Sequence, residues 1–124
     1  MQQVIDQRHL ADTAALNQLF EQAVPFRHIA LTDFLARDFY ERIKAEFPVP
    51  DVEAMRSEFG DASLKHTVES ITGLGDTFRA WDATLRSPEF IHWLQSVTGI
   101  EGLIFDPTYE GAGTHNNLHG QSLD

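Results

Sequence analysis

The sequence of 124 residues contains no cysteine. Disulfide bonds, thiolate catalysis and zinc sites built on cysteine are therefore excluded. Basic residues are also scarce, because nine Lys and Arg stand against nineteen Asp and Glu, which gives a formal net charge of -10. A chain of that charge repels phosphate backbones and anionic lipid headgroups. We therefore expect neither nucleic acid nor a membrane as a partner.

Long apolar runs are missing as well. No stretch approaches the roughly 20 apolar residues that a membrane-spanning helix needs. Residues 1–12 are polar and lack the apolar region of a secretory signal peptide. The apolar content of 42%, with nine Phe and two Trp, is enough for the core of one modest domain. The sequence thus predicts a single cytoplasmic domain over residues 1–124.

The clearest pattern begins at Ser87 and ends at Gly99. Ser87 suits the N-cap of a helix, and Pro88 suits the first helical position, where its missing N–H is not needed. Gly99 provides a C-terminal stop. Three apolar residues stand between them at helical spacing and are expected to be buried: Phe90, Leu94 and Val97. The pattern predicts a helix between Ser87 and Gly99.

Helical spacing also predicts helices over residues 13–23, 36–47 and 76–85. The second of these presents Phe39, Tyr40 and Ile43 on one face, which we expect to be buried. Short β-prone runs at 26–31 and 103–105, followed by a glycine-rich segment at 108–115, predict strands. This mixture of helices and strands indicates an α+β fold.

Six histidines raise the question of a metal site, but none stands in a strong ligand spacing. His66 and Glu69 are three residues apart, a spacing that surface helices often show. His115 and His119 are four apart, but the glycines before them argue against a shared helix face. No His-X-Asp or His-X-Glu pair occurs. The residues themselves therefore predict no metal ligand and no catalytic residue, and the roles of His66 and His119 stay open.

Several motifs nevertheless stand in a familiar order. They are Phe34-Leu35, Glu46-Phe47-Pro48, Ser87-Pro88-Glu89-Phe90, Trp93-Leu94, Val97-Thr98-Gly99-Ile100 and Gly111-Ala112-Gly113-Thr114-His115. In this order and spacing they resemble the N-terminal half of a 2-oxoglutarate- and Fe(II)-dependent dioxygenase of the prolyl-hydroxylase-like group. The resemblance runs from about Phe26 to the end of the chain.

The resemblance implies N-terminal helices that buttress the first strands of a double-stranded β-helix, or jelly roll. It implies an oxidoreductase, a hydroxylase that uses Fe(II) and 2-oxoglutarate, with ascorbate as a compatible further cofactor. In the family a His-X-Asp pair and a distal His hold the iron. That pair follows the segment matching Leu118 to Asp124. We therefore expect an incomplete barrel, truncated before the metal-binding motif and inactive by itself, in the N-terminal portion of an oxygenase domain.

Two residues are assigned to cofactor binding through the resemblance. Tyr109 is similar in place to a tyrosine that faces the 2-oxoglutarate pocket in related hydroxylases. His115 matches a histidine that lines the mouth of the pocket without binding iron. The alternatives are a packing role for Tyr109 and a polar strand edge for His115.

Three interpretations of function stay open. The chain is part of a dioxygenase that is catalytic in its full-length form, with a small molecule or a protein side chain as substrate. Alternatively, it is a shortened relative without the metal site that serves as a binding or dimerisation module, or an unrelated acidic α+β domain. An unpaired strand edge in an incomplete barrel would favour a homo-oligomer.

Overall fold

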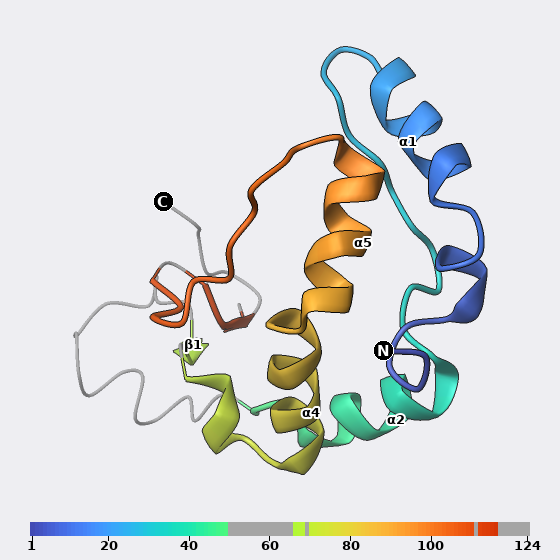
Figure 1. Cartoon of the computed structure of the whole chain (residues 1–124). Coiled ribbons are helices and arrows are strands. Elements are labelled where there is room, and N and C mark those ends of the chain that lie inside the picture. Colours follow the sequence, from blue (N-terminus) through green and yellow to red (C-terminus); the bar gives the residue numbers. More distant parts are fainter. Residues whose placement is uncertain (50–65, 69, 111, 117–124) are drawn as a thin grey trace.

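The structure, a computed structural model, describes residues 1–49, 66–68, 70–110 and 112–116 (Figure 1). Four helices dominate them: α1 (Thr13–Gln22), α2 (Arg37–Glu46), α4 (Asp76–Leu85) and α5 (Pro88–Thr98). Two short 3-10 helices, η1 (Gln7–His9) and η2 (Ile71–Gly73), and two strands, β1 (His66–Val68) and β2 (Thr114–Asn116), accompany them. None of the helices in these ranges has both the length and the apolar character needed to cross a bilayer.

Helix α5 begins and ends where the sequence predicts. The Ser87 hydroxyl accepts a hydrogen bond from the Phe90 amide at 3.2 Å, and Pro88 occupies the first turn. Gly99 is left-handed, with φ of 72°, and its amide donates to the Gln95 carbonyl at 2.8 Å. Both ends are therefore satisfied by local chemistry, which is why the local sequence predicts them well.

The helices pack in a chain of neighbours. Figure 1 shows α4 leading directly into α5, with α1 beside α5 and α2 beside α4. The Asn17 side chain on α1 donates to the Val97 carbonyl of α5 at 3.0 Å, which ties these two helices together. The predicted helices over 13–23, 36–47 and 76–85 are confirmed as α1, α2 and α4, within one residue at each end.

The N-terminal residues supply the centre of the core. Ile5 forms an isolated antiparallel bridge with Leu35, and the Ala36 amide donates to the Val4 carbonyl at 2.8 Å. These bonds place Val4 and Ile5 against Phe39 of α2, and all three side chains are buried. The N-terminal residues, which are mostly polar, therefore contribute two buried side chains to the core, and Ile5 has no exposed surface.

A continuous series of aromatic rings joins this core to α4 and α5. Trp93 lies 5.6 Å from Phe34 and 5.7 Å from Phe90, measured between ring centroids. Trp81 lies 6.5 Å from Phe90 and 6.4 Å from Phe39. The Trp93 indole N–H donates to the His9 carbonyl at 2.8 Å, so its one polar atom is satisfied inside the core.

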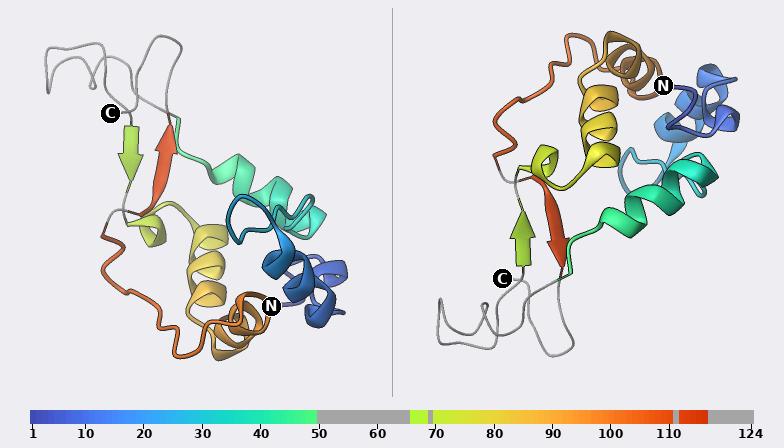
Figure 2. Two further views of the ribbon diagram at one scale, coloured as in Figure 1. Left: turned by 90° about the horizontal axis from the view of Figure 1, so that it is seen from above. Right: turned by 90° about the horizontal axis from the view of Figure 1, so that it is seen from below.

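The predicted α+β jelly-roll fold is wrong, because the described chain is mostly helical. Its strands amount to one antiparallel pair of three residues each, in which Thr67 lies opposite His115. Figure 2 shows this pair at one end of the molecule, with α1 and the N-terminus at the other. Two strands of this length cannot form an independent sheet with its own core, so the helices carry the fold and buttress no barrel here.

The predicted strands at 26–31 and 103–105 are not formed either. Phe26 and Ile104 expose 68% and 89% of their surface, and neither run pairs with a described strand. An apolar run of three to six residues becomes a strand only when another strand lies beside it, and sequence pattern does not show the neighbour.

Burial on the helices follows the prediction in part. Phe39 and Val97 are buried, whereas Ile43, Phe90 and Leu94 are half-buried. Tyr40 was predicted to be buried and is instead 48% exposed. It points away from the core because Phe39, the residue before it, takes the inward position on α2.

Candidate functional site

Tyr109 belongs to a polar network with α4, called here the Tyr109–Asp82–Arg86 network. The Tyr109 hydroxyl donates to Asp82 Oδ1 at 2.6 Å, and Arg86 Nη2 donates to the same oxygen at 2.7 Å. Asp82 is buried, so its negative charge depends on these two donors. The network fastens the chain after α5 to the middle of α4.

The electrostatics of the network favour a charged Asp82. The hydrogen bond from Arg86 is the main reason that the pKa of Asp82 lies below its ordinary value, and the bond from Tyr109 adds to it against the effect of burial. The same pair raises the pKa of Arg86. Burial, followed by the bond to Asp82, raises the pKa of Tyr109 well above its ordinary value. Tyr109 is therefore a neutral hydrogen-bond donor, not a phenolate, near neutral pH.

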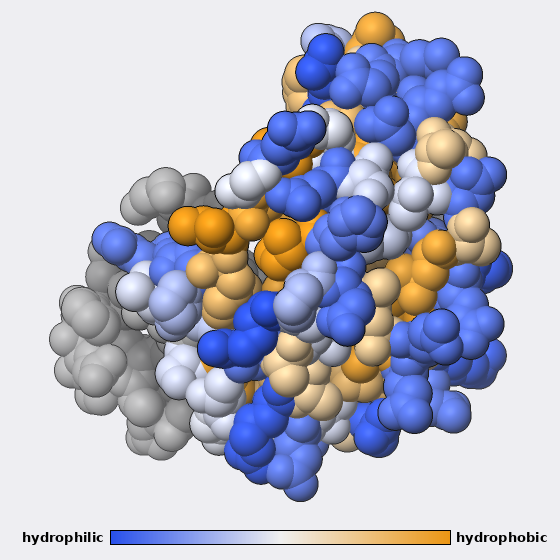
Figure 3. Space-filling model, in the orientation of Figure 1, coloured by the Kyte–Doolittle hydropathy of each residue, from blue (hydrophilic) through white to orange (hydrophobic). Residues whose placement is uncertain are grey.

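Aromatic contacts hold the segment around Tyr109. The Phe105 ring lies edge-on to Tyr109 at 5.5 Å, and the Arg86 guanidinium lies over Phe105 at 4.8 Å from the ring centroid. Upstream, the Leu103 amide donates to Gln95 Oε1 at 3.0 Å. Figure 3 shows hydrophobic side chains on this face beside α5 and along the segment that follows it. The segment is thus attached through a few side chains and stays partly exposed.

A small cavity of about 230 Å³ adjoins the network. Its lining is rich in hydroxyl groups and includes the one guanidinium of the network: Ser70, Thr72, Arg86, Thr108 and Tyr109. Because the Tyr109 hydroxyl proton is already donated to Asp82, contact with a 2-oxoglutarate carboxylate would require that proton to change partner. The cofactor role of Tyr109 therefore stays a prediction that implies a rearrangement of this hydrogen bond.

His115 lies in β2, and its side chain is exposed. The other residues of β2 face a second, larger space, the apolar groove, which α2 and α4 close from the opposite side. Tyr109 and His115 are thus carried by the same stretch of chain, but Tyr109 lines the small cavity and His115 lines neither space. The structure does not bring them together in one described cavity, and the cofactor role of His115 also stays a prediction.

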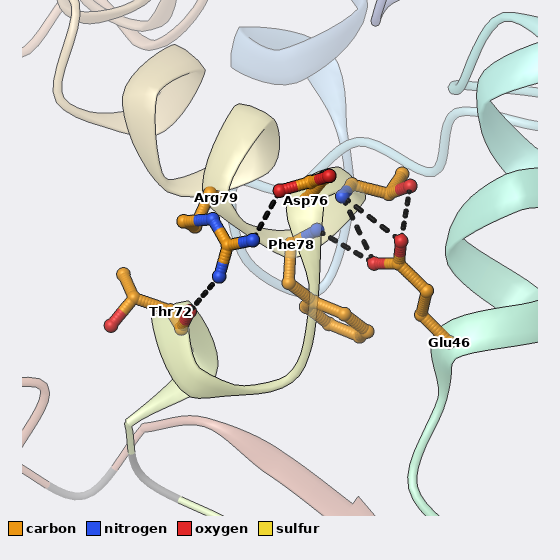
Figure 4. A network of polar contacts seen from close by, with 6 residues as sticks. Glu46, Thr72, Asp76, Phe78 and Arg79 are labelled. Atoms are coloured by element: carbon orange, nitrogen blue, oxygen red, sulfur yellow. Dashed lines mark hydrogen bonds and ion pairs between the residues drawn. The ribbon is translucent and has the colours of Figure 1, made fainter.

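A second polar cluster, the Glu46 clamp, fixes α2 against the start of α4 (Figure 4). The Glu46 carboxylate accepts hydrogen bonds from the Thr77 amide at 3.0 and 3.1 Å and from the Thr77 hydroxyl at 2.8 Å. The Phe78 amide donates to it at 3.2 Å. Helix N-termini leave such amides without partners and attract negative charge. Glu46 therefore caps a helix to which it does not belong.

The glycine before α4 makes room for this clamp. A Cβ on Gly75 would lie 2.6 Å from the Glu46 carboxyl carbon, and the Gly75 φ is 156°. Burial by itself would raise the pKa of Glu46, but the hydrogen bonds from Thr77 and Phe78 outweigh it and the pKa is lowered. The arrangement fixes α2 beside α4, where both helices line the groove.

Within the described ranges, no three His, Cys, Asp or Glu side chains gather closely enough to hold a metal ion. The iron ligands that the family resemblance implies are expected after the segment matching Leu118 to Asp124, so the described residues do not test that iron site. His66 lies in β1, with its backbone opposite Asn116. Gly111, His119 and the predicted approach to the metal motif at 118–124 lie outside the described residues. Comparison with protein-family models, curated proteins and solved structures found no match for this chain.

Sequence reasoning missed both carboxylates of these clusters. Asp82 stands at helical spacing among apolar residues of α4, and a carboxylate in such a stripe is a signal for a buried partner. Glu46 offered a weaker signal. Gly75 precedes the helix without a side chain that could cap it, so a cap had to come from elsewhere in the chain.

Proposed function

We propose that this chain is part of an Fe(II)- and 2-oxoglutarate-dependent dioxygenase that hydroxylates a small molecule or a protein side chain. Its contribution is a helical support that positions Tyr109 and His115, while the iron ligands lie outside the described residues. When bound, the iron and 2-oxoglutarate would supply the oxidising chemistry, by oxidative decarboxylation to succinate and CO2. The proposal includes a cytoplasmic location, which suits a sequence without cysteine.

The observation that carries the proposal is the anchoring of Tyr109. A hydrogen bond to the buried Asp82 carboxylate attaches a short, exposed segment to the centre of α4. The residue that donates this bond is Tyr109, for which the resemblance predicts cofactor contact. A tyrosine that only fills space does not need a buried charged partner. A tyrosine whose hydroxyl must be held at a fixed place needs such a partner, because the hydrogen bond sets the orientation of the side chain.

The first test is the coding sequence beyond Asp124. We expect a His-X-Asp pair soon after that residue, followed by a distal His and a basic residue. The full-length protein should then release succinate from 2-oxoglutarate in the presence of Fe(II) and ascorbate. Absence of the His-X-Asp pair, or a full-length protein with no iron-dependent succinate release, would contradict the proposal.

The second test addresses Tyr109 in the full-length protein. Tyr109→Phe should raise KM for 2-oxoglutarate and leave kcat nearly unchanged, since the phenol is proposed to position the cofactor and not to react. Tyr40→Phe is the matched control, because Tyr40 is the other tyrosine of the sequence and lies exposed on α2. Equal kinetic effects of both variants would remove the support for a role of Tyr109.

A binding or dimerisation module is the second candidate function. Large apolar side chains stay exposed near the groove and along the segment after α5, including Phe47 at 41%, Val49 at 87% and Ile104 at 89%. Exposed apolar surface favours association with a partner or a second copy. Sedimentation equilibrium of the 124-residue chain would support this alternative if the mass rose with concentration and Ile104→Ser abolished the rise.

A further inference from the structure

The apolar groove lies between the β2 strand and the facing sides of α2 and α4. Its volume is about 650 Å³, and its apolar lining includes Ile43, Phe47, Phe78 and Trp81. Sites for small organic ligands have volumes in this range and linings of this character. The described residues of the helices and the strand leave this space between them.

One polar atom in the groove lining has no hydrogen-bond partner among the described residues. Thr114 is only 8% exposed, and its hydroxyl oxygen makes no hydrogen bond within the part of the chain that the structure describes. Buried hydroxyl groups almost always have a partner, because leaving one unsatisfied is costly. Thr114 lines the groove, so a ligand seated there would supply the missing partner.

The charge of the residues around the groove favours a negatively charged ligand. Among the described residues that line it, Lys44 is the charged one, and none is acidic, although the whole chain has a net charge of -10. The Lys44 ammonium lies 5.7 Å from the Tyr40 ring centroid, at an exposed position on α2. Glu46, two residues later, directs its carboxylate to the start of α4 instead. A carboxylate is an acceptor that suits both the ammonium and the hydroxyl.

We infer that the apolar groove binds a small amphipathic carboxylic acid. Its apolar body covers Phe47, Phe78 and Trp81, and its carboxylate accepts hydrogen bonds from Lys44 and Thr114. The inference does not depend on the dioxygenase proposal, because the residues it uses are all described and it needs no metal.

Calorimetric titration of the 124-residue chain with octanoate tests the inference, and octanamide serves as a neutral probe of the same length. Octanoate should bind saturably and more tightly than octanamide. Lys44→Gln should weaken octanoate binding about two- to fivefold, as expected for a partly exposed ion pair, and should leave octanamide unaffected. Arg27→Gln is the matched control, since Arg27 pairs with Glu21 and is not one of the residues that line the groove. No saturable binding, or equal binding of both probes, overturns the inference.

Thr114 permits a second test in which two readouts move in opposite directions. Thr114→Val keeps the shape and removes the unpartnered hydroxyl, so the free protein should melt at a higher temperature. The same variant should bind octanoate about two- to tenfold more weakly, because one hydrogen bond is lost. Thr114→Ser retains the hydroxyl and should keep octanoate affinity close to that of the parent chain. If Thr114→Val melts lower and binds octanoate unchanged, Thr114 is a structural residue and the inference fails.

Discussion

The helical body and the segment that follows it are held by different forces. The helical body, residues 1–47 and 76–99, is organised around buried apolar and aromatic side chains from the N-terminal residues, α2, α4 and α5. The C-terminal segment, residues 100–110 and 112–116, has few buried side chains. It is attached through hydrogen bonds to Gln95 and Asp82, the contact of Phe105 with Arg86, and the pairing of β2 with β1. The body is therefore fixed mainly by burial, and the segment mainly by a few local contacts of single side chains.

This difference bears on function, because both predicted cofactor-binding residues lie in the C-terminal segment. Burial is collective, so loss of one core side chain weakens the whole body. A polar attachment is local, so loss of one bond releases only what that bond holds. A segment of this second kind can be rearranged without unfolding its support, which suits residues that must meet a ligand.

The largest loss of stability should come from a substitution in the core. Phe39→Ala should lower the free energy of unfolding by about 3–5 kcal/mol, because it empties a space shared by the N-terminus, α2 and α4. Urea denaturation followed by circular dichroism measures the change. Phe26→Ala is the control and should cost little, since Phe26 is 68% exposed. Similar losses for both variants would mean that the body is not organised around Phe39.

A smaller loss of stability is expected from a substitution at the junction of α2 and α4. Gly75→Ala should destabilise the chain by about 1–3 kcal/mol, because the new methyl group strains the backbone and displaces the Glu46 carboxylate. Gly73→Ala is the control, as a Cβ there meets no atom within 4 Å. Thermal unfolding of the two variants should separate them clearly. If Gly75→Ala is as stable as the parent chain, the clamp does not hold the two helices together.

Acid should weaken the same junction. The pKa of Glu46 in the folded chain lies below its ordinary value of 4.5, so the unfolded chain takes up a proton first as the pH falls. The clamp therefore contributes its full stability above about pH 4.5 and loses it as the pH falls through the lower folded pKa. Denaturation of the parent chain and of Glu46→Gln between pH 3 and 7 should show a difference near neutrality that shrinks in acid. A difference that is constant with pH would show that the charge of Glu46 contributes nothing.

The smallest change in global stability should come from a substitution in the Tyr109–Asp82–Arg86 network. Tyr109→Phe removes one hydrogen bond to Asp82 and should cost about 1 kcal/mol, because Arg86 still pairs with the carboxylate. Limited proteolysis should nevertheless cut the variant faster between residues 100 and 110, while cleavage of α5 stays unchanged. A global loss as large as that of Phe39→Ala would contradict the division into a body and a locally attached segment.

A structural feature could be predicted from the sequence where neighbouring residues in the chain determine it. The bounds of α5 follow from Ser87, Pro88 and Gly99, residues that act on their immediate neighbours, and this prediction is confirmed. The predicted strand at 103–105 is wrong, because a strand needs a neighbour that the pattern does not identify. Burial of Val4 and Ile5 was also missed, since it arises from pairing with the chain around Leu35. The candidate site was predicted only as two residues, and Asp82, the hydrogen-bond partner of Tyr109, comes from an element distant in sequence.

Hydrogen exchange read residue by residue tests the central claim most directly, namely that a polar attachment holds the C-terminal segment on an independently stable helical body. In the parent chain we expect strong protection in α5 and α4 and weak protection from residue 100 to 110, apart from the Leu103 amide, which is bonded to Gln95. Asp82→Asn should lower protection between 103 and 110 and leave α5 unchanged. Uniformly strong protection through residue 116, or loss of protection throughout α5 in the variant, would contradict this account.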